Sequence, residues 1–481
     1  MTTDDILLLL PQLILIVAGV ALMLLEPFTP PERKGRMARI AVLAAAVAAY
    51  SLKFQWNAHS RTILHGMLII DNYSAFFQFL FLIITAFSAF LSMKFNERES
   101  IQRGEYYALL LFACSGMSLM ASSGDLILTF LGIEILSIAT YILAGFKRTD
   151  IRSNESSLKY FLLGSFATAI LLYGIALIYG GTGTTNYISI REMAALEGGV
   201  QTTTVIGFGL LLVGFGFKVA LVPFHSWVPD VYEGAPTSVT AFMAVGPKAA
   251  GFAALLRILV QVFPHLTQDW NPVLWILAIL TMTLGNVVAV LQTSVKRMLA
   301  YSAIAHAGYI LVGVVANSDT GSGAVLFYLV VYTFMNLVAF GVVLSFSRKG
   351  DQHVYLDDYA GLGQKAPFAA AALSLALISL AGIPLTGGFM GKFYLFSAAV
   401  QKGYIGLAII GVLNSVVSVY YYFRVLIYMY VKEPGKDATD PEPMAWPVQA
   451  IVGIGVIIIL FLGIHPDKIL ALAGYSSLAL K

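Results

Sequence analysis

Apolar stretches of about 20 residues recur along almost the whole chain, and they constrain its fold more than any other feature. A helix of that length crosses the hydrocarbon core of a bilayer, and only helices and closed barrels satisfy the backbone in lipid. We therefore predict an all-α, polytopic membrane protein with about fourteen transmembrane helices. Their expected positions are 5–25, 37–56, 69–93, 107–122, 124–146, 157–179, 203–228, 236–261, 272–291, 298–317, 322–346, 368–398, 403–430 and 446–464.

Composition agrees with a membrane protein and excludes a thiolate-bound iron–sulfur cluster. The 481 residues are 58% hydrophobic and only 11% charged, which is unlike a soluble domain. Cys114 is the only cysteine, so neither a disulfide framework nor a thiolate-bound iron–sulfur cluster can form within the chain. No basic leader precedes the first apolar stretch, and we expect no cleavable signal peptide.

Lysine and arginine gather in alternate loops, which predicts the orientation. The basic loops lie around 33–36, 94–103, 147–159, 296–297, 348–365 and 432–436. The other loops carry few basic residues. Because basic loops stay on the cytoplasmic side, the pattern predicts an even number of helices with both termini outside.

Two of the expected spans contain helix-breaking residues near their middle. The stretch 368–398 is too long for one simple span and contains LAGIPLTGGFMGKF, with Pro384 and several glycines. The other is GFGFKVALVPFHSWVPDVYEGAP, in which Pro223 follows Lys218. Each break lies close to a lysine. We predict discontinuous helices at both places; the alternative is ordinary proline kinks.

Interrupted helices in corresponding positions of two halves indicate internal repeats. We predict two inverted five-helix repeats, 107–261 and 272–430, each with one discontinuous helix. An N-terminal three-helix segment would occupy 1–106. A C-terminal helix and an amphipathic tail would occupy 431–481, and the tail sequence PDKILALAGYSSLALK is expected to lie at the membrane surface.

Four ionisable residues lie inside apolar stretches: Glu134, Lys218, Lys248 and Lys392. A charge near the bilayer centre is costly and usually marks an ion or proton path. Lys248 lies mid-span, and its own span contains no carboxylate. Lys218 precedes a break, where freed carbonyls are expected to hold its ammonium, and Glu134 is its natural counter-ion. The alternative for this pair is a purely structural buried salt bridge.

These residue types suit proton transfer. Burial disfavours the charged form of a lysine and a nearby carboxylate favours it, so moving a glutamate would load or release a proton. His225 in LVPFHSW and His306 in AYSAIAHAGY are candidates to pass protons; the alternative is that each is only a hydrogen-bonding group. We expect Arg257 to extend toward the outer surface and Arg424 to anchor its helix at the interface.

Three long motifs support a specific resemblance. The stretches GFGFKVALVPFHSWVPDVYEGAPTSVTAFMAVGPKAAGF, SVKRMLAYSAIAHAGYI and GIPLTGGFMGKFYLF resemble the antiporter-like membrane subunits of respiratory complex I, which are related to subunits of multi-subunit Na⁺/H⁺ antiporters. The resemblance covers nearly the whole chain. The lysine in GGFMGKFYLF is similar to that of the subunit N branch.

The resemblance implies a proton-translocating membrane-arm subunit of an NADH–quinone oxidoreductase, driven by quinone reduction in other subunits. It implies that Glu134 and Lys218 form a coupled pair, that Lys248 is the central connecting lysine, and that Lys392 leads to the opposite side. NADH, FMN, iron–sulfur clusters and quinone would belong to the rest of the complex, with no cofactor, metal or redox residue in this chain.

The implied partners are the other membrane subunits, the lipid bilayer and protons, with no nucleic acid. The implied location is a bacterial inner membrane, with both termini on the periplasmic side. Two alternatives remain open at this stage. One is a subunit of a Na⁺/H⁺ antiporter with the same fold, and the other is a scaffold that holds the membrane arm together without transporting ions.

Overall fold

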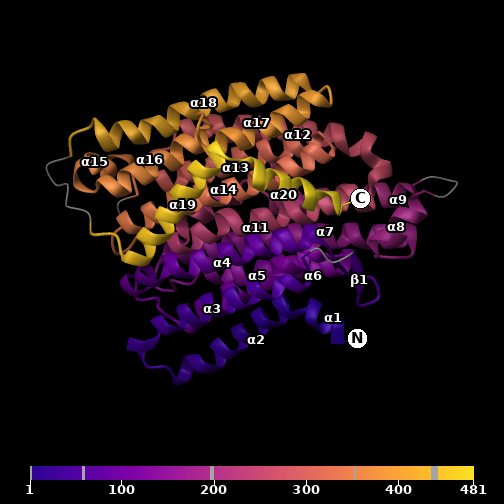
Figure 1. The fold of residues 1–481 in the computed structure, drawn as a ribbon, viewed down its shortest axis with the longest axis horizontal. Coiled ribbons are helices and arrows are strands. Elements are labelled where there is room, and N and C mark those ends of the chain that lie inside the picture. The colour runs from indigo at the N-terminus through magenta and orange to yellow at the C-terminus, as the bar shows by residue number, and fades with distance from the viewer. Residues whose placement is uncertain (1–2, 57–59, 196–199, 352–353, 435–441, 481) are drawn as a thin grey trace.

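Long helices lie side by side and form a single bundle in the computed structural model of the chain (Figure 1). The structure describes residues 3–56, 60–195, 200–351, 354–434 and 442–480. Both ends of the chain lie at the same end of the bundle (Figure 1). A short antiparallel hairpin, β1 (Arg61–Ile63) and β2 (Leu68–Ile70), lies near the N-terminal helices.

The described residues form twenty α-helices, of which several are short. Their bounds are α1 Thr3–Leu8, α2 Leu10–Leu25, α3 Gly35–Ser51, α4 Asn72–Arg98, α5 Gly104–Ser122, α6 Leu126–Ala144, α7 Ile151–Thr182, α8 Tyr187–Ala194, α9 Thr202–Lys218, α10 Trp227–Gly234, α11 Thr237–Arg257, α12 Thr267–Val290, α13 Val295–Val315, α14 Asp319–Phe346, α15 Leu362–Lys365, α16 Pro367–Ala381, α17 Gly387–Gln401, α18 Ile405–Tyr430, α19 Trp446–Ile464 and α20 Asp467–Leu478.

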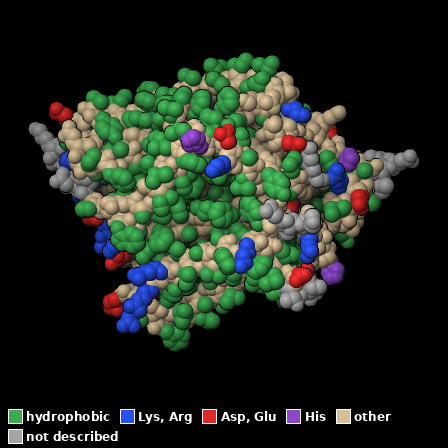
Figure 2. Space-filling model, viewed as in Figure 1, with side chains coloured by type: hydrophobic (Ala, Val, Ile, Leu, Met, Phe, Trp, Pro, Cys, Tyr) green, Lys and Arg blue, Asp and Glu red, His purple; other side chains and the backbone are tan. Residues whose placement is uncertain are grey.

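Eleven helical stretches of the described residues are long and apolar enough to cross a membrane, and α9 and α16 are shorter apolar helices. Apolar side chains cover most of the face in Figure 2, with charged side chains gathered mostly toward the two ends of the bundle. The prediction of a mostly helical, multi-span membrane protein is confirmed. The C-terminal helix α20 packs against α14 and α4 of the same chain.

Burial is greatest along the middle of the bundle. Every residue in the apolar window that begins in α11 is buried, and nearly every one in that of α13, whereas only a third of the window is buried in α2, α7 and α18. Helices that are apolar on all sides belong in the interior of a bundle. A charge in the middle of α11 is therefore surrounded by protein and has no route to the surface.

The first break separates α9 from α10. α9 ends at Lys218, and Ala220 has a positive φ of 65°, which ends the helical path. Other groups satisfy the backbone at the break: Val222 N donates to Thr281 Oγ1 (3.0 Å), and Trp227 Nε1 donates to the Phe217 carbonyl (3.1 Å). The predicted interruption at this position is present.

The second break separates α16 from α17. Gly382 has a φ of +87° and ends α16, and α17 begins at Gly387. Ser379 Oγ accepts a hydrogen bond from Gly388 N (3.0 Å), which satisfies one of the free donors at the start of α17. This interruption also lies where proline and glycine predict it.

Close packing at the second break depends on glycine. A Cβ on Gly388 would lie 1.8 Å from the Ser379 carbonyl oxygen, which is backbone and cannot rotate away. We expect Gly388→Ala to lower the free energy of unfolding by about 1–3 kcal/mol or more, because it overpacks this contact. Thermal denaturation of the purified complex measures the change. Gly406→Ala is the matched control, because a Cβ there meets open space; equal stability of both variants would contradict the prediction.

The expectation for Arg257 is wrong. Its side chain is fully buried and forms an ion pair with Asp71, with Nη1 2.9 Å from Oδ2 and Nη2 2.9 Å from Oδ1. Asp71 caps α4, accepting from Ser74 N, and Arg257 ends α11. Asp71 lies 186 positions away in the sequence, so the local sequence around Arg257 gives no indication of this carboxylate.

Candidate functional site

Lys218 ends α9 and Glu134 lies on α6; the two side chains interact electrostatically, but no ion pair joins them in the described part of the chain. Lys218 is buried, and its Nζ donates to Ser137 Oγ at 2.6 Å. The Glu134 carboxylate is close enough to interact electrostatically with Lys218, yet its buried Oε1 has no hydrogen-bond partner among the described residues. The expectation that freed backbone carbonyls hold Lys218 is wrong, because the hydroxyl on α6 occupies that place.

Lys248 lies in the interior of α11. Its Nζ donates to the Ala303 carbonyl on α13 and lies 5.5 Å from the centre of the Tyr332 ring on α14. Pro247, next to it, cannot donate to the Met243 carbonyl, and the Tyr232 hydroxyl of α10 donates to that carbonyl instead (3.1 Å). Within the described part of the chain, no carboxylate forms an ion pair with Lys248.

His306 lies near two of the buried lysines. Its ring is buried on α13, with Nδ1 2.6 Å from the Tyr328 hydroxyl and Nε2 3.2 Å from the Tyr422 hydroxyl. Both Lys248 and Lys392 lie near enough to interact with it electrostatically. The structure therefore brings together three of the predicted residues, from α11, α13 and α17.

Lys392 is held by the second break. Its Nζ donates to the carbonyls of Leu380 and Ala381, both at 3.0 Å, at the end of α16. These are carbonyls that the break frees from helical bonding. The ammonium also lies 4.5 Å from the centre of the Tyr309 ring, a cation–π distance. Backbone carbonyls thus hold a lysine ammonium at the second break, whereas we expected this arrangement at the first.

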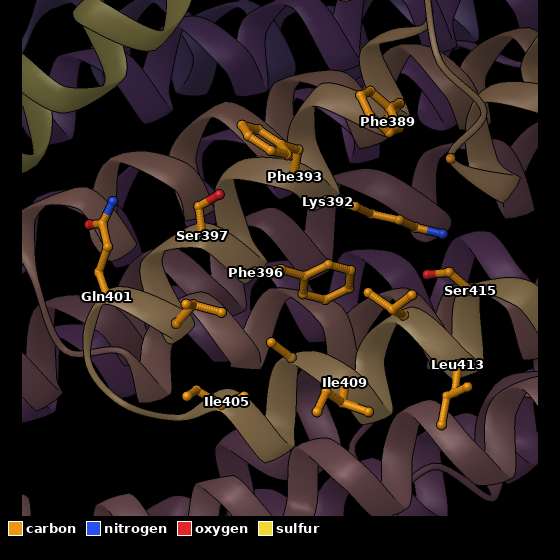
Figure 3. A pocket seen from close by; sticks show the side chains of 14 residues that line it. Phe389, Lys392, Phe393, Phe396, Ser397, Gln401, Ile405, Ile409, Leu413 and Ser415 are labelled. Carbon is orange, nitrogen blue, oxygen red and sulfur yellow. The ribbon is translucent and has the colours of Figure 1, made fainter.

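A groove runs beside Lys392 between α17 and α18 (Figure 3). It encloses about 720 Å³, and Phe389, Phe393 and Phe396 form much of one wall. Ile409 and other apolar side chains of α18 form the opposite wall. The polar groups of the lining are Lys392, Ser397, Gln401 and Ser415.

His225 is not brought into the cluster around His306. It lies in the first break, between α9 and α10, and is half-buried. Its Nδ1 is buried without a hydrogen-bond partner among the described residues. The sequence could not distinguish the two histidines, because both occur in apolar segments.

At the end of the bundle that carries the basic loops, charged side chains form a network next to α10. Arg297 pairs with Asp230 (3.0 Å) and Glu233 (2.6 Å), and Lys159 also reaches Asp230 (3.1 Å). A cavity of about 190 Å³ lies among these side chains. Arg424 is half-buried at the same end and donates to the backbone carbonyls of Val290 (2.9 Å), the last residue of α12, and of Gln292, in agreement with an anchor at the helix end.

Sequence reasoning missed the polar partners of the buried cations. Ser137 lies one helical turn after Glu134, and that spacing could have identified it. Tyr328 and Tyr422 come from α14 and α18 and could not be assigned to His306 without the fold. Across the described ranges, no group of three or more His, Cys, Asp or Glu side chains could hold a metal ion.

Comparison with known sequences places these residues in a family context. Residues 123–418 match the family described as NADH:quinone oxidoreductase/Mrp antiporter, TM. The chain is 49% identical over 465 residues to NADH-quinone oxidoreductase subunit N of Trichlorobacter lovleyi, covering 96% of this chain and 95% of that protein. It is 44% identical over 478 residues to subunit N 1 of Solibacter usitatus, covering 99% and 98%.

Solved structures agree with the sequence comparison. A chain of respiratory complex I from Thermus thermophilus, solved with bound aureothin, matches with a TM-score of 0.81 and 36% identity over 96% of this chain and 99% of that chain. A chain of the Mrp complex from Dietzia sp. matches with a TM-score of 0.87 and 23% identity over 100% and 98%, which shows a shared fold.

Proposed function

We propose a mechanism from the premise that the chain belongs to the NADH-quinone oxidoreductase subunit N family. It is an antiporter-like membrane-arm subunit of that translocating oxidoreductase, and it sits among other membrane-arm subunits. In our proposal, protons move through Glu134, Lys218, Lys248, His306 and Lys392. The observation that carries it is Lys248, whose ammonium lies inside the fully buried apolar window of α11 with no carboxylate partner among the described residues.

The path starts at the pair on α6 and α9. Quinone reduction elsewhere in the complex changes the field or the position of Glu134 relative to Lys218. When the carboxylate moves away, the charged form of Lys218 loses its main support and releases a proton. Neutral Lys248 takes up that proton and becomes an ammonium, so the charge advances by one residue.

His306 then connects Lys248 with Lys392. Its two ring nitrogens face hydroxyls of Tyr328 and Tyr422, so the ring can accept a proton on one nitrogen while the other donates. Lys392 would receive the proton beside the second break and lead it toward the outer side. We place His225 at the entrance of the path, because it lies in the first break and its buried Nδ1 has no hydrogen-bond partner among the described residues.

We further propose the predicted organisation of the chain. Fourteen crossings result when α5 and the two interrupted helices are added to the long apolar helices. The interrupted helices, each with a lysine at its break, support two inverted five-helix repeats at 107–261 and 272–430, flanked by 1–106 and 431–481. We place both termini on the periplasmic side of a bacterial inner membrane, and NADH, FMN, the clusters and quinone in other subunits.

The first test is Lys218→Ala in the assembled complex. We expect NADH-driven proton pumping in vesicles, and the turnover coupled to it, to fall on the order of tenfold or more, because a positioned proton-transfer group is lost. Blue-native gels and subunit stoichiometry of the same membranes show whether the complex assembles. Lys94→Ala is the control, since that lysine is exposed and pairs with Glu97, which is also exposed.

Two outcomes would oppose this function. Failure of Lys218→Ala to assemble, with normal turnover in the remaining complex, would favour a scaffold. Sodium-dependent transport without NADH oxidation would favour an antiporter subunit instead.

A further inference from the structure

Ser137 is the direct hydrogen-bond partner of Lys218, and nothing in the proposed proton path so far explains it. The hydroxyl is buried on α6 and accepts from Lys218 Nζ at 2.6 Å. At the same time it donates to the Ile133 carbonyl one turn earlier. Its hydrogen therefore points along the helix, and its lone pairs face the lysine.

Glu134 and Ser137 offer Lys218 two alternative partners on one helix. They are three positions apart, so both lie on the same face of α6. In this structure the lysine is bonded to the hydroxyl, while a carboxylate oxygen of Glu134 has no hydrogen-bond partner in the described part of the chain. A buried carboxylate oxygen without a partner is costly, and it marks a place where a donor can arrive.

The two partners differ in which protonation state of lysine they stabilise. A carboxylate accepts only, so Glu134 favours the ammonium. A hydroxyl both donates and accepts. It accepts from the ammonium, as it does here, and after rotating away from the Ile133 carbonyl it can donate to the lone pair of a neutral amine.

We propose that Ser137 is the positioning residue that holds Lys218 while it releases its proton, so that Lys218 alternates between Glu134 and Ser137. This inference rests on the proposed function. The ammonium moves from Glu134 to Ser137 and passes one proton to the next base of the path. The remaining amine accepts a hydrogen bond from the Ser137 hydroxyl, and the positive charge leaves with the proton. When Lys218 takes up a new proton, the Ser137 hydroxyl rotates back toward the Ile133 carbonyl and the ammonium returns to Glu134.

The test compares three substitutions of Ser137 in the intact complex. Ser137→Ala removes the hydroxyl, and Ser137→Cys keeps nearly the same volume with a much weaker hydrogen-bonding group. We expect both variants to assemble and their NADH-driven pumping rate to fall about tenfold, because a hydrogen bond to a charged group is lost. Ser137→Thr retains the hydroxyl, and we expect it to restore pumping.

Ser118→Ala is the matched control. That serine is buried on α5 and donates to the Cys114 carbonyl four residues earlier, as Ser137 does to Ile133, but it does not contact Lys218. Normal pumping in Ser137→Ala would overturn the inference, and so would a loss in Ser137→Thr equal to that in Ser137→Ala. If Lys218→Ala pumps normally, the proposed function itself fails; if Lys218→Ala is inactive while Ser137→Ala is normal, only this inference fails.

Discussion

Lys248→Met is expected to lower proton pumping severely and to leave the complex assembled. Methionine fills a similar volume without a titratable group, so it removes the proton carrier while keeping the packing of α11. Lys248 has a backbone carbonyl as its hydrogen-bond partner, and no carboxylate of the described chain is left unpaired when the charge is lost. Stability should therefore stay equal or rise, while the pumping rate falls on the order of 10²-fold.

Lys248→Arg separates charge from proton transfer. Arginine keeps a positive charge, but its guanidinium does not release a proton in proteins. We expect it to pump as poorly as Lys248→Met, although the charge is present. Proton yield per electron in vesicles, measured beside thermal denaturation, distinguishes the two properties. A full proton yield from either variant would remove Lys248 from the path.

The long helices and both breaks could be predicted because their causes are local. The apolar stretches follow from the requirement to cross lipid, and the proline and glycine residues grouped around Pro223 and Gly382 weaken the helix locally. Lys218, Lys248 and Lys392 can be identified as candidate site residues in the same way, because a lysine inside an apolar span is costly and usually functional. The spans, the breaks and the buried lysines can therefore all be recognised from residues that are neighbours in the sequence.

Partners across the bundle could not be predicted in the same way. His306 meets Tyr328 and Tyr422 from helices that follow it in the sequence, and nothing in their local sequence selects these tyrosines among the 24 in the chain. Ser137 is the intermediate case. Its spacing from Glu134 was visible, but a serine within an apolar helix commonly bonds only to its own backbone.

The ion pair between Arg257 and Asp71 also joins residues far apart in the sequence, and the local sequence does not identify it. Breaking this pair is expected to have the largest effect on stability. The guanidinium binds both carboxylate oxygens and also donates to the Ala121 carbonyl (3.0 Å), and neither side chain is exposed. The pair joins the start of α4 to the end of α11, the helix that carries Lys248. Arg257→Ala would leave the Asp71 carboxylate buried and unpaired, which costs about 3–5 kcal/mol.

We therefore expect Arg257→Ala to reduce assembled complex severely, measured by blue-native gels and by thermal denaturation of what remains. The double variant Arg257→Met with Asp71→Asn should recover most of the loss, because it removes both charges and asparagine still caps α4. An exposed pair is the control: Lys94→Ala, opposite Glu97, should change stability by less than about 1 kcal/mol. Recovery in the double variant would attribute the loss to the unpaired carboxylate, whereas equal instability of both variants would contradict that cause. Pumping by the recovered complex would then show that this pair anchors the helix of Lys248 without belonging to the proton path.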